Sequence, residues 1–239
     1  MKNHSFLKGV TDGLPICLGY LSVSFAFGIF ATESGMTLLE TLLISITNVT
    51  SAGQLAAVPI MAAGGSLAEL AMAQFVINLR YALMSVSLSQ KLDKNIRLFD
   101  RFLIAFVNTD EVFAVVSGKE GTVGRKFLYG LILTPYLGWS LGTLIGAGAG
   151  QILPEAITSA LGIAIYGMFI AIVIPPAKKN RATALCVITA IVFSCVFTYV
   201  PVLAKIPGGF TIIICAVMAS AIFAALFPIR IAEEECDHA

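Results

Sequence analysis

Long apolar runs limit this chain to one class of fold. Eight of its segments approach or exceed the length of about 20 apolar residues that a helix needs to cross a bilayer. They are Leu14–Ala31, Thr37–Ala63, Ser66–Ser89, Phe99–Ser117, Phe127–Gly150, Ala156–Ile174, Ala182–Val200 and Phe210–Phe227. Only 12% of the 239 residues are charged, compared with about 25% in an ordinary soluble domain. We therefore predict an all-α, polytopic protein that forms a single integral membrane domain over residues 1–239.

Two of these runs are interrupted by polar residues near their centres. Thr37–Ala63 contains Asn-Val-Thr-Ser-Ala-Gly-Gln at 48–54, and Phe99–Ser117 contains Asn-Thr-Asp-Glu at 108–111. Because hydrocarbon offers no water to satisfy polar groups, both stretches must face protein or a wet cavity. Proline falls elsewhere inside the runs, at Pro15, Pro59 and Pro135, where we expect a kink or a break.

Basic residues give the orientation of the chain, since Lys and Arg in short loops favour the cytoplasm. Four clusters stand out: Lys2 and Lys8; Lys91, Lys94, Arg97 and Arg101; Lys119, Arg125 and Lys126; and Lys178, Lys179 and Arg181. Eight simple crossings would put the second cluster outside the cell. All four clusters lie inside if the two interrupted runs each enter the membrane and return on the same side. We predict six full transmembrane helices, two re-entrant or broken helices and both termini in the cytoplasm; eight transmembrane helices are the alternative.

The first interruption has the composition of a ligand site. Ser51, Ala52 and Gly53 are small enough for a solute to touch the backbone, and Gln54 can both donate and accept hydrogen bonds. Transporters use freed N–H groups and helix N-termini to bind carboxylates, and freed carbonyls to bind cations. We predict that Ser51–Gln54 bind substrate. The alternative is a packing face of small residues between helices.

The second interruption places two acids within the membrane. An acid at the centre of a membrane helix costs roughly 2.5–3.5 kcal/mol, so it needs a partner or a function. Burial disfavours the charged form of a carboxyl group, and we predict that Asp110 and Glu111 take part in proton coupling, with Asn108 and Thr109 beside them in the substrate site. The alternative is a helix tip at the cytoplasmic face, where both acids would be hydrated.

Arg80 lies deep in an apolar run, eleven residues before Lys91, or about 16 Å from that end at the helical rise. Its guanidinium could bind a substrate carboxylate at two points or form a structural pair with Asp110. Asn78 lies two residues earlier, and we expect it to cap or brace a broken helix as well as to border the site.

Small residues recur every fourth position in Phe127–Gly150. The ridge consists of Gly130, Thr134, Gly138, Gly142, Gly146 and Gly150. Such a ridge permits close approach of a second helix. We expect tight internal packing, with a subunit interface as the alternative.

Known enzyme signatures are absent from the sequence. Both histidines are terminal, and there is no His-Glu-x-x-His, Gly-x-Ser-x-Gly, phosphate-binding loop or paired-aspartate metal site. We expect neither an enzyme nor a cofactor or metal site, and the net charge of +1 gives no reason to expect nucleic acid as a partner. The five cysteines lack metal or redox spacing and are expected to be unpaired.

Several short motifs together resemble the AzlC family, the large subunits of branched-chain amino acid exporters. They are Gly19-Tyr20, Ala26-Phe27-Gly28, Ser51–Gln54, Asn78–Tyr81, Thr109–Glu111, Gly138-Trp139 and Met168–Ala171. The resemblance spans nearly the whole chain, but Leu55 replaces an aromatic residue that often follows the glutamine in the family.

The resemblance implies export of branched-chain or similar hydrophobic amino acids from the bacterial cytoplasm, with a small AzlD-type membrane subunit as partner. The residues themselves are compatible with this function, because a zwitterion needs one anion site and one cation site. Two alternatives remain at this point: a channel-like facilitator for small polar solutes and a membrane scaffold that does not transport.

Overall fold

The structure is a computed structural model that describes residues 5–150, 152–154, 156, 157, 167, 170 and 173–227. These residues are mostly helical, and their one β-type pairing is an isolated bridge between Leu92 and Val123. The all-α prediction is therefore confirmed. The chain divides into two compact units, Met1–Phe169 and Ile170–Ala239, and each is described by itself. That the whole chain forms a single domain stays a prediction.

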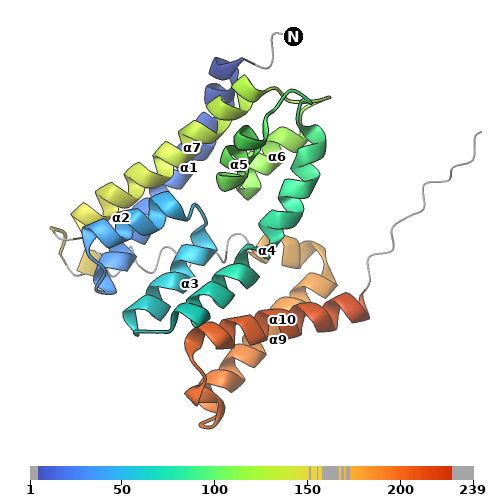
Figure 1. Cartoon of the computed structure of the whole chain (residues 1–239). Coiled ribbons are helices and arrows are strands. Elements are labelled where there is room, and N and C mark those ends of the chain that lie inside the picture. The colour runs from blue at the N-terminus through green and yellow to red at the C-terminus, as the bar shows by residue number, and fades with distance from the viewer. Residues whose placement is uncertain are drawn as a thin grey trace, which may run out of the picture. The chain divides into compact units, whose positions relative to one another are not determined.

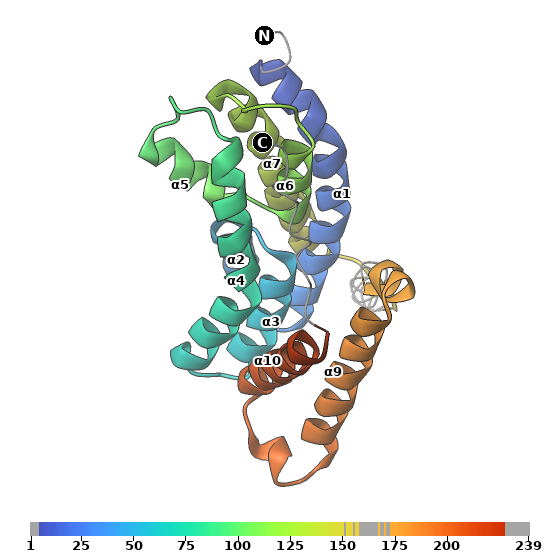
Figure 2. The same ribbon diagram turned by 90° about the vertical axis from the view of Figure 1, so that its right-hand side faces the viewer.

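Three long helices frame the first unit: α1 (Phe6–Glu33), α4 (Leu67–Lys91) and α7 (Arg125–Ala149). All three are long and apolar enough to cross a membrane. α1 and α7 lie side by side over their whole length and run in the same direction (Figures 1 and 2).

Glycine makes the close approach of α1 and α7 possible. A Cβ atom on Gly9 of α1 would lie 2.1 Å from the carbonyl oxygen of Phe127. At the other end of the pair, a Cβ on Gly146 of α7 would lie 2.0 Å from the carbonyl oxygen of Phe25. The small-residue ridge thus serves internal packing between two membrane helices, as expected from the sequence.

Both interrupted runs are broken helices. The first consists of α2 (Leu38–Thr47) and α3 (Ser51–Ala62), and the second of α5 (Leu98–Phe106) and α6 (Asp110–Ser117). Each of these four helices has fewer than 18 residues, so none of them is long enough to cross a membrane alone. We call residues 48–50 the first break and residues 107–109 the second break.

Each broken helix returns to the end of the unit from which it starts. The first leaves the C-terminus of α1 and leads into the N-terminus of α4, whereas the second leaves the C-terminus of α4 and leads into the N-terminus of α7 (Figure 1). Because α1, α4 and α7 each run the length of the unit, the two broken helices enter from opposite ends. This is the re-entrant arrangement predicted from the basic residues.

Polar side chains rather than proline make the breaks. Thr50 and Thr109 have extended backbone conformations and cap the next helices, and their hydroxyl groups accept from the N–H groups of Gly53 and Val112 at 3.4 Å. In contrast, α1, α3 and α7 continue through Pro15, Pro59 and Pro135. The helices are therefore not broken at these prolines, and a kink at these positions stays a prediction.

Charge separates the two ends of the first unit. One end carries Lys8, Asp12, Lys91, Lys119 and Arg125, where Lys119 pairs with Asp12 at 2.7 Å and Lys91 donates to the carbonyl oxygen of Lys119 at 3.0 Å. We call it the basic end. Among the residues that the structure describes, the other end carries Glu33, Glu40 and Glu69 and no lysine or arginine.

The second unit is a helical pair of α9 (Arg181–Tyr199) and α10 (Gly208–Leu226), joined by the 3₁₀ turn η2 (Leu203–Lys205). Both helices are long and apolar enough to cross a membrane, which brings the number of such helices among the described residues to five. The predicted sixth span, Ala156–Ile174, lies mostly outside the described residues, as do Met168, Phe169 and Ala171 of one family motif.

Candidate functional site

The first break holds a buried polar cluster against α7. Gln54, in the first turn of α3, is fully buried and donates from Nε2 to Ser45 Oγ at 3.0 Å. Ser45 in turn shares a 2.7 Å hydrogen bond with Thr143 of α7. The Oε1 atom of Gln54 is buried with no hydrogen-bond partner among the described residues, so half of this amide is unused.

A second glutamine ties the first break to α4. Gln74 Nε2 donates to the carbonyl oxygen of Gly53 at 2.8 Å, and Gln74 Oε1 accepts from Asn48 at 3.2 Å and Asn78 at 3.1 Å. Asn78 therefore braces the broken helix, as predicted, through a residue that the sequence did not single out. A Cβ on Gly53 would lie 2.6 Å from Gln74 Oε1, so an alanine here would require the Gln74 side chain to shift.

Ser51 and Ala52 form the first turn of α3 together with Gly53 and Gln54. The first turn of a helix presents N–H groups that have no partner within the helix, and the helix dipole adds partial positive charge there. Thr50 uses one of these groups, that of Gly53. The geometry of this turn suits a carboxylate.

The second break is held from α4 and α1. Asn108 is 3% exposed and donates to Ser85 Oγ of α4 at 3.2 Å. Thr109 is also buried and caps α6. Oδ1 of Asn108 has no partner among the described residues, so this break too contains a half-satisfied amide.

The charged residues that follow the second break are paired. Arg80 Nη1 lies 2.7 Å from Asp110 Oδ2, and the Tyr20 hydroxyl donates to Glu111. Of the two roles predicted for Arg80, binding a substrate carboxylate or pairing with Asp110, the structure shows the pair with Asp110. Both side chains of this pair are about half exposed, at 52% and 47%, so the pair is open to a solute on one side.

Aromatic residues at mid-depth connect the two breaks. Tyr136, eleven residues into α7, donates to the carbonyl oxygen of Ile46 beside the first break at 3.1 Å. The same ring lies 6.2 Å from Phe106 beside the second break. On the other side, Tyr20 meets buried Trp139 edge-on at 5.2 Å, which accounts for the tryptophan within the glycine ridge.

The structure thus brings the predicted residues into two groups at similar depth. Ser51–Gln54 lie with Asn78, and Asn108–Glu111 lie with Arg80. Within residues 5–150, no hydrogen bond or ion pair joins the two groups directly. The sequence analysis did not identify five polar partners of these residues: Ser45, Gln74, Ser85, Tyr136 and Thr143. Their only signal in the sequence is that each is a polar side chain within an apolar run.

Unpaired polar atoms concentrate around the breaks. In the part of the chain that the structure describes, five buried side-chain atoms have no hydrogen-bond partner, and four of them belong to Gln54, Asn78, Asn108 and Trp139. Buried polar groups are normally satisfied, and each exception needs an explanation. Three of these four are amide oxygens, which suit a cationic donor, and the fourth is an indole N–H.

Comparison with known proteins identifies the family. The profile of the AzlC protein family matches residues 15–153, which include both breaks. The chain belongs to the AzlC family.

Curated relatives agree with this assignment. The chain is 32% identical over 195 residues to the inner membrane protein YgaZ of Escherichia coli K12, and the match covers 79% of each chain. It is 33% identical over 186 residues to an uncharacterized membrane protein of Archaeoglobus fulgidus, covering 77% of this chain and 81% of the relative. An uncharacterized membrane protein of Helicobacter pylori strain 26695 is 28% identical over 155 residues, covering 62% of this chain and 67% of the relative.

No solved structure matches the chain. Family and fold agree that this is a multi-pass membrane protein, which is consistent with a transporter.

Proposed function

We propose that this AzlC-family protein is a secondary exporter of branched-chain or similar hydrophobic amino acids. The observation that supports the proposal most strongly is the pair of broken helices that enter from opposite ends and carry buried, half-satisfied amides at their breaks. Transporters place binding sites at interrupted helices because only there does a membrane interior offer free backbone groups. A protein that merely packs its helices has no need for three unpaired amide oxygens.

The groups around the breaks match the chemistry of a zwitterion. The ammonium group would bind a free oxygen of Gln54 or Asn78 in the first group, or that of Asn108 in the second, since amide oxygens accept hydrogen bonds. The carboxylate would bind the first turn of α3 at Ser51–Gly53, or Arg80 in place of Asp110. A branched aliphatic side chain needs only an apolar wall.

Proton coupling is proposed for Asp110 and Glu111. Both acids lie at the N-terminus of α6, and each already has one partner, Arg80 or Tyr20. Protonation of Asp110 would release Arg80, which could then take the substrate carboxylate. Such an exchange would link one proton to one amino acid.

The orientation that we propose places the basic end in the cytoplasm. Lys and Arg near membrane helices favour that side, and the charged residues described at the opposite end of the first unit are all acidic. The N-terminus then lies inside, and the C-terminus is expected there too. By analogy with YgaZ, named as an inner membrane protein, we place the chain in the bacterial cytoplasmic membrane.

The proposed partner is a small AzlD-type membrane subunit. The proposal is tested by export of labelled leucine, isoleucine, valine and methionine from cells that express this chain with and without that subunit. Saturable export against a concentration difference supports a secondary exporter. Flux that only follows the gradient would favour a channel-like facilitator, and no flux in either case would favour a scaffold.

A further inference from the structure

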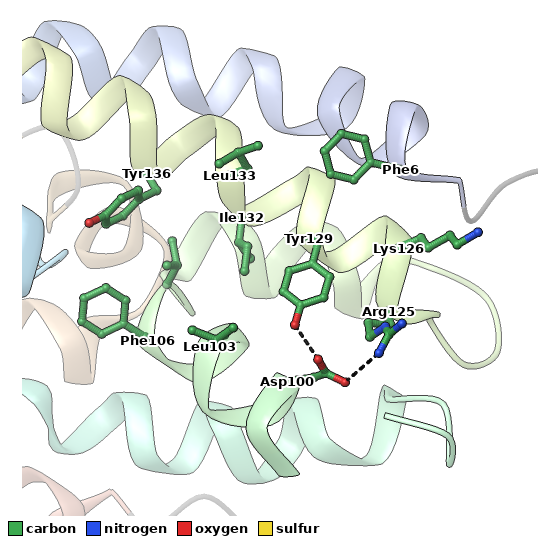
Figure 3. Close-up of a pocket in the computed structure, with 11 residues that line it drawn as sticks. Phe6, Asp100, Leu103, Phe106, Arg125, Lys126, Tyr129, Ile132, Leu133 and Tyr136 are labelled. Carbon is green, nitrogen blue, oxygen red and sulfur yellow. Dashed lines mark hydrogen bonds and ion pairs between the residues drawn. The ribbon is translucent and has the colours of Figure 1, made fainter. Parts of the chain in front are cut away.

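A groove lies between α5 and α7 and reaches the second break at Val107. It is a cavity of about 710 Å³, whose lining comes mainly from these two helices (Figure 3). It extends from charged residues at the basic end to Phe106 and Tyr136 near the second break. Between these ends the lining is aliphatic and includes Leu103, Ile132 and Leu133.

The outer end of the groove carries surplus positive charge. Asp100 accepts from Tyr129 at 2.5 Å and lies 3.5 Å from Arg125, a long contact for an ion pair. Lys126 lines the same end and has no carboxylate within ion-pair distance among the described residues. This end of the groove therefore carries two cations and one anion, and the Arg125 side chain is 49% exposed.

The length of the groove corresponds to one leaflet of a bilayer. Arg125 and Tyr136 are eleven residues apart on α7, which is about 16 Å at 1.5 Å per residue. The hydrocarbon core of a bilayer is about 30 Å thick, so one acyl chain reaches roughly 15 Å from its headgroup to the midplane. The charged end thus lies at headgroup level when Tyr136 lies at mid-depth.

Side chains around the groove indicate an apolar environment. α5 also exposes Phe99 and Phe102, at 69% and 67%, and α7 exposes Leu137 beyond the groove. An aqueous passage would need polar walls, whereas hydrocarbon can contact these side chains without cost.

From these observations we infer that the groove binds one anionic phospholipid. Its phosphate lies on Arg125 and Lys126, and one acyl chain follows Leu103, Ile132 and Leu133 toward Tyr136. Basic pockets between membrane helices on the cytoplasmic side suit such headgroups. The lipid would brace α5, which leads directly to the second break.

The charge requirement is tested with the purified, delipidated full chain. Native mass spectrometry would measure retention of phosphatidylglycerol and of phosphatidylcholine with identical acyl chains. At about a fivefold contribution per basic residue, we expect the double variant Arg125→Gln/Lys126→Gln to bind phosphatidylglycerol roughly 30-fold more weakly. Lys178→Gln/Lys179→Gln removes the same charge from exposed positions of the second unit and should leave binding unchanged. Equal retention of both lipids, or equal loss in both double variants, would overturn the assignment.

The groove itself is tested without changing charge. Leu133→Trp fills the cavity from α7, and Leu137→Trp adds the same ring one turn further along, outside the lining. Phosphatidylglycerol should be lost from the first variant and kept by the second. If Leu133→Trp keeps the lipid, a charged surface alone binds it and the groove is not the site. If, in a preparation that also contains the small membrane subunit, Leu133→Trp releases only that subunit, the occupant is a protein and the lipid assignment fails.

Discussion

At the scale of single residues, Gln54 departs most clearly from ordinary helix packing. Its Nε2 donates a hydrogen bond to Ser45 Oγ, whereas its Oε1 is buried and has no hydrogen-bond partner among the described residues. Leaving a buried acceptor unsatisfied costs about 1–3 kcal/mol, and apolar packing alone gives no reason to keep such an atom. A substrate ammonium would remove that cost each time it binds.

Replacement of Gln54 by leucine should therefore impair transport more than folding. A hydrogen bond to a charged group contributes about 1.5–3 kcal/mol, so we expect the affinity for leucine to fall roughly 10- to 100-fold, measured by binding to the purified protein. Ser45 and Thr143 still satisfy each other in this variant. Gln90→Leu, at an exposed position of α4, is the matched control and should bind normally. An unchanged affinity in Gln54→Leu would remove this residue from the site.

Asp110 permits a test of proton coupling. We expect Asp110→Asn to fold, because Asn can still contact Arg80, but to lose export driven by a proton gradient. The measurement is leucine flux in proteoliposomes with and without an imposed pH difference. Asn95→Asp, which adds an acid at an exposed loop position, should remain coupled. Full, proton-dependent export by Asp110→Asn would refute the role of this carboxyl group.

At the scale of helices, the α1–α7 pair is the rigid support on which both breaks depend. It supplies Tyr20, Trp139, Tyr136 and Thr143 to the breaks. The separation of these helices is set by glycine, since added Cβ atoms would collide with backbone.

A pair of glycines in α7 tests this packing. A Cβ on Gly146 would lie 2.0 Å from the carbonyl oxygen of Phe25, whereas one on Gly148 would meet nothing within 4 Å. Overpacking typically costs about 1–3 kcal/mol, so Gly146→Ala should lower the melting temperature in detergent and reduce the yield of folded protein. Gly148→Ala should behave like the wild type. Equal stability of the two variants would show that the helices are not in close contact.

The sequence predicts features that are formed by residues close together in the chain, and it does not predict contacts between residues far apart in the chain. The breaks at Asn48 and Asn108 and the glycine ridge are local patterns, and they were visible in the sequence. Contacts such as Ser45 with Thr143 or Tyr20 with Glu111 join positions about 90 to 100 residues apart. A lone serine or tyrosine in an apolar run carries no information about its partner, so these contacts required the structure.

At the scale of the whole molecule, the first unit has a basic end and an acidic end, and one broken helix enters from each. Such an arrangement suits a site that opens to the two sides of the membrane in turn. Alternating access requires this property, because the site must open to one side at a time.

Labelling of cysteines by a membrane-impermeant maleimide tests the proposed orientation. In a background without the five native cysteines, Ala63→Cys, at the end of α3, should react from outside intact cells. Asn95→Cys, in the loop before α5, should react only after the membrane is opened. The reverse pattern would contradict the re-entrant topology, because eight simple crossings from a cytoplasmic N-terminus put position 95 outside and position 63 inside. Labelling of both positions from outside would show that α4, which separates them, does not cross the membrane.

The most direct test of the account is protection of the two breaks by substrate. Ser51→Cys places a thiol directly beside the first break and Asn108→Cys places one in the second, whereas Ala63→Cys places one outside the site. The account predicts that leucine slows maleimide labelling at both breaks and leaves position 63 unaffected. Unchanged labelling at both breaks, in a protein that still transports leucine, would show that the substrate binds elsewhere.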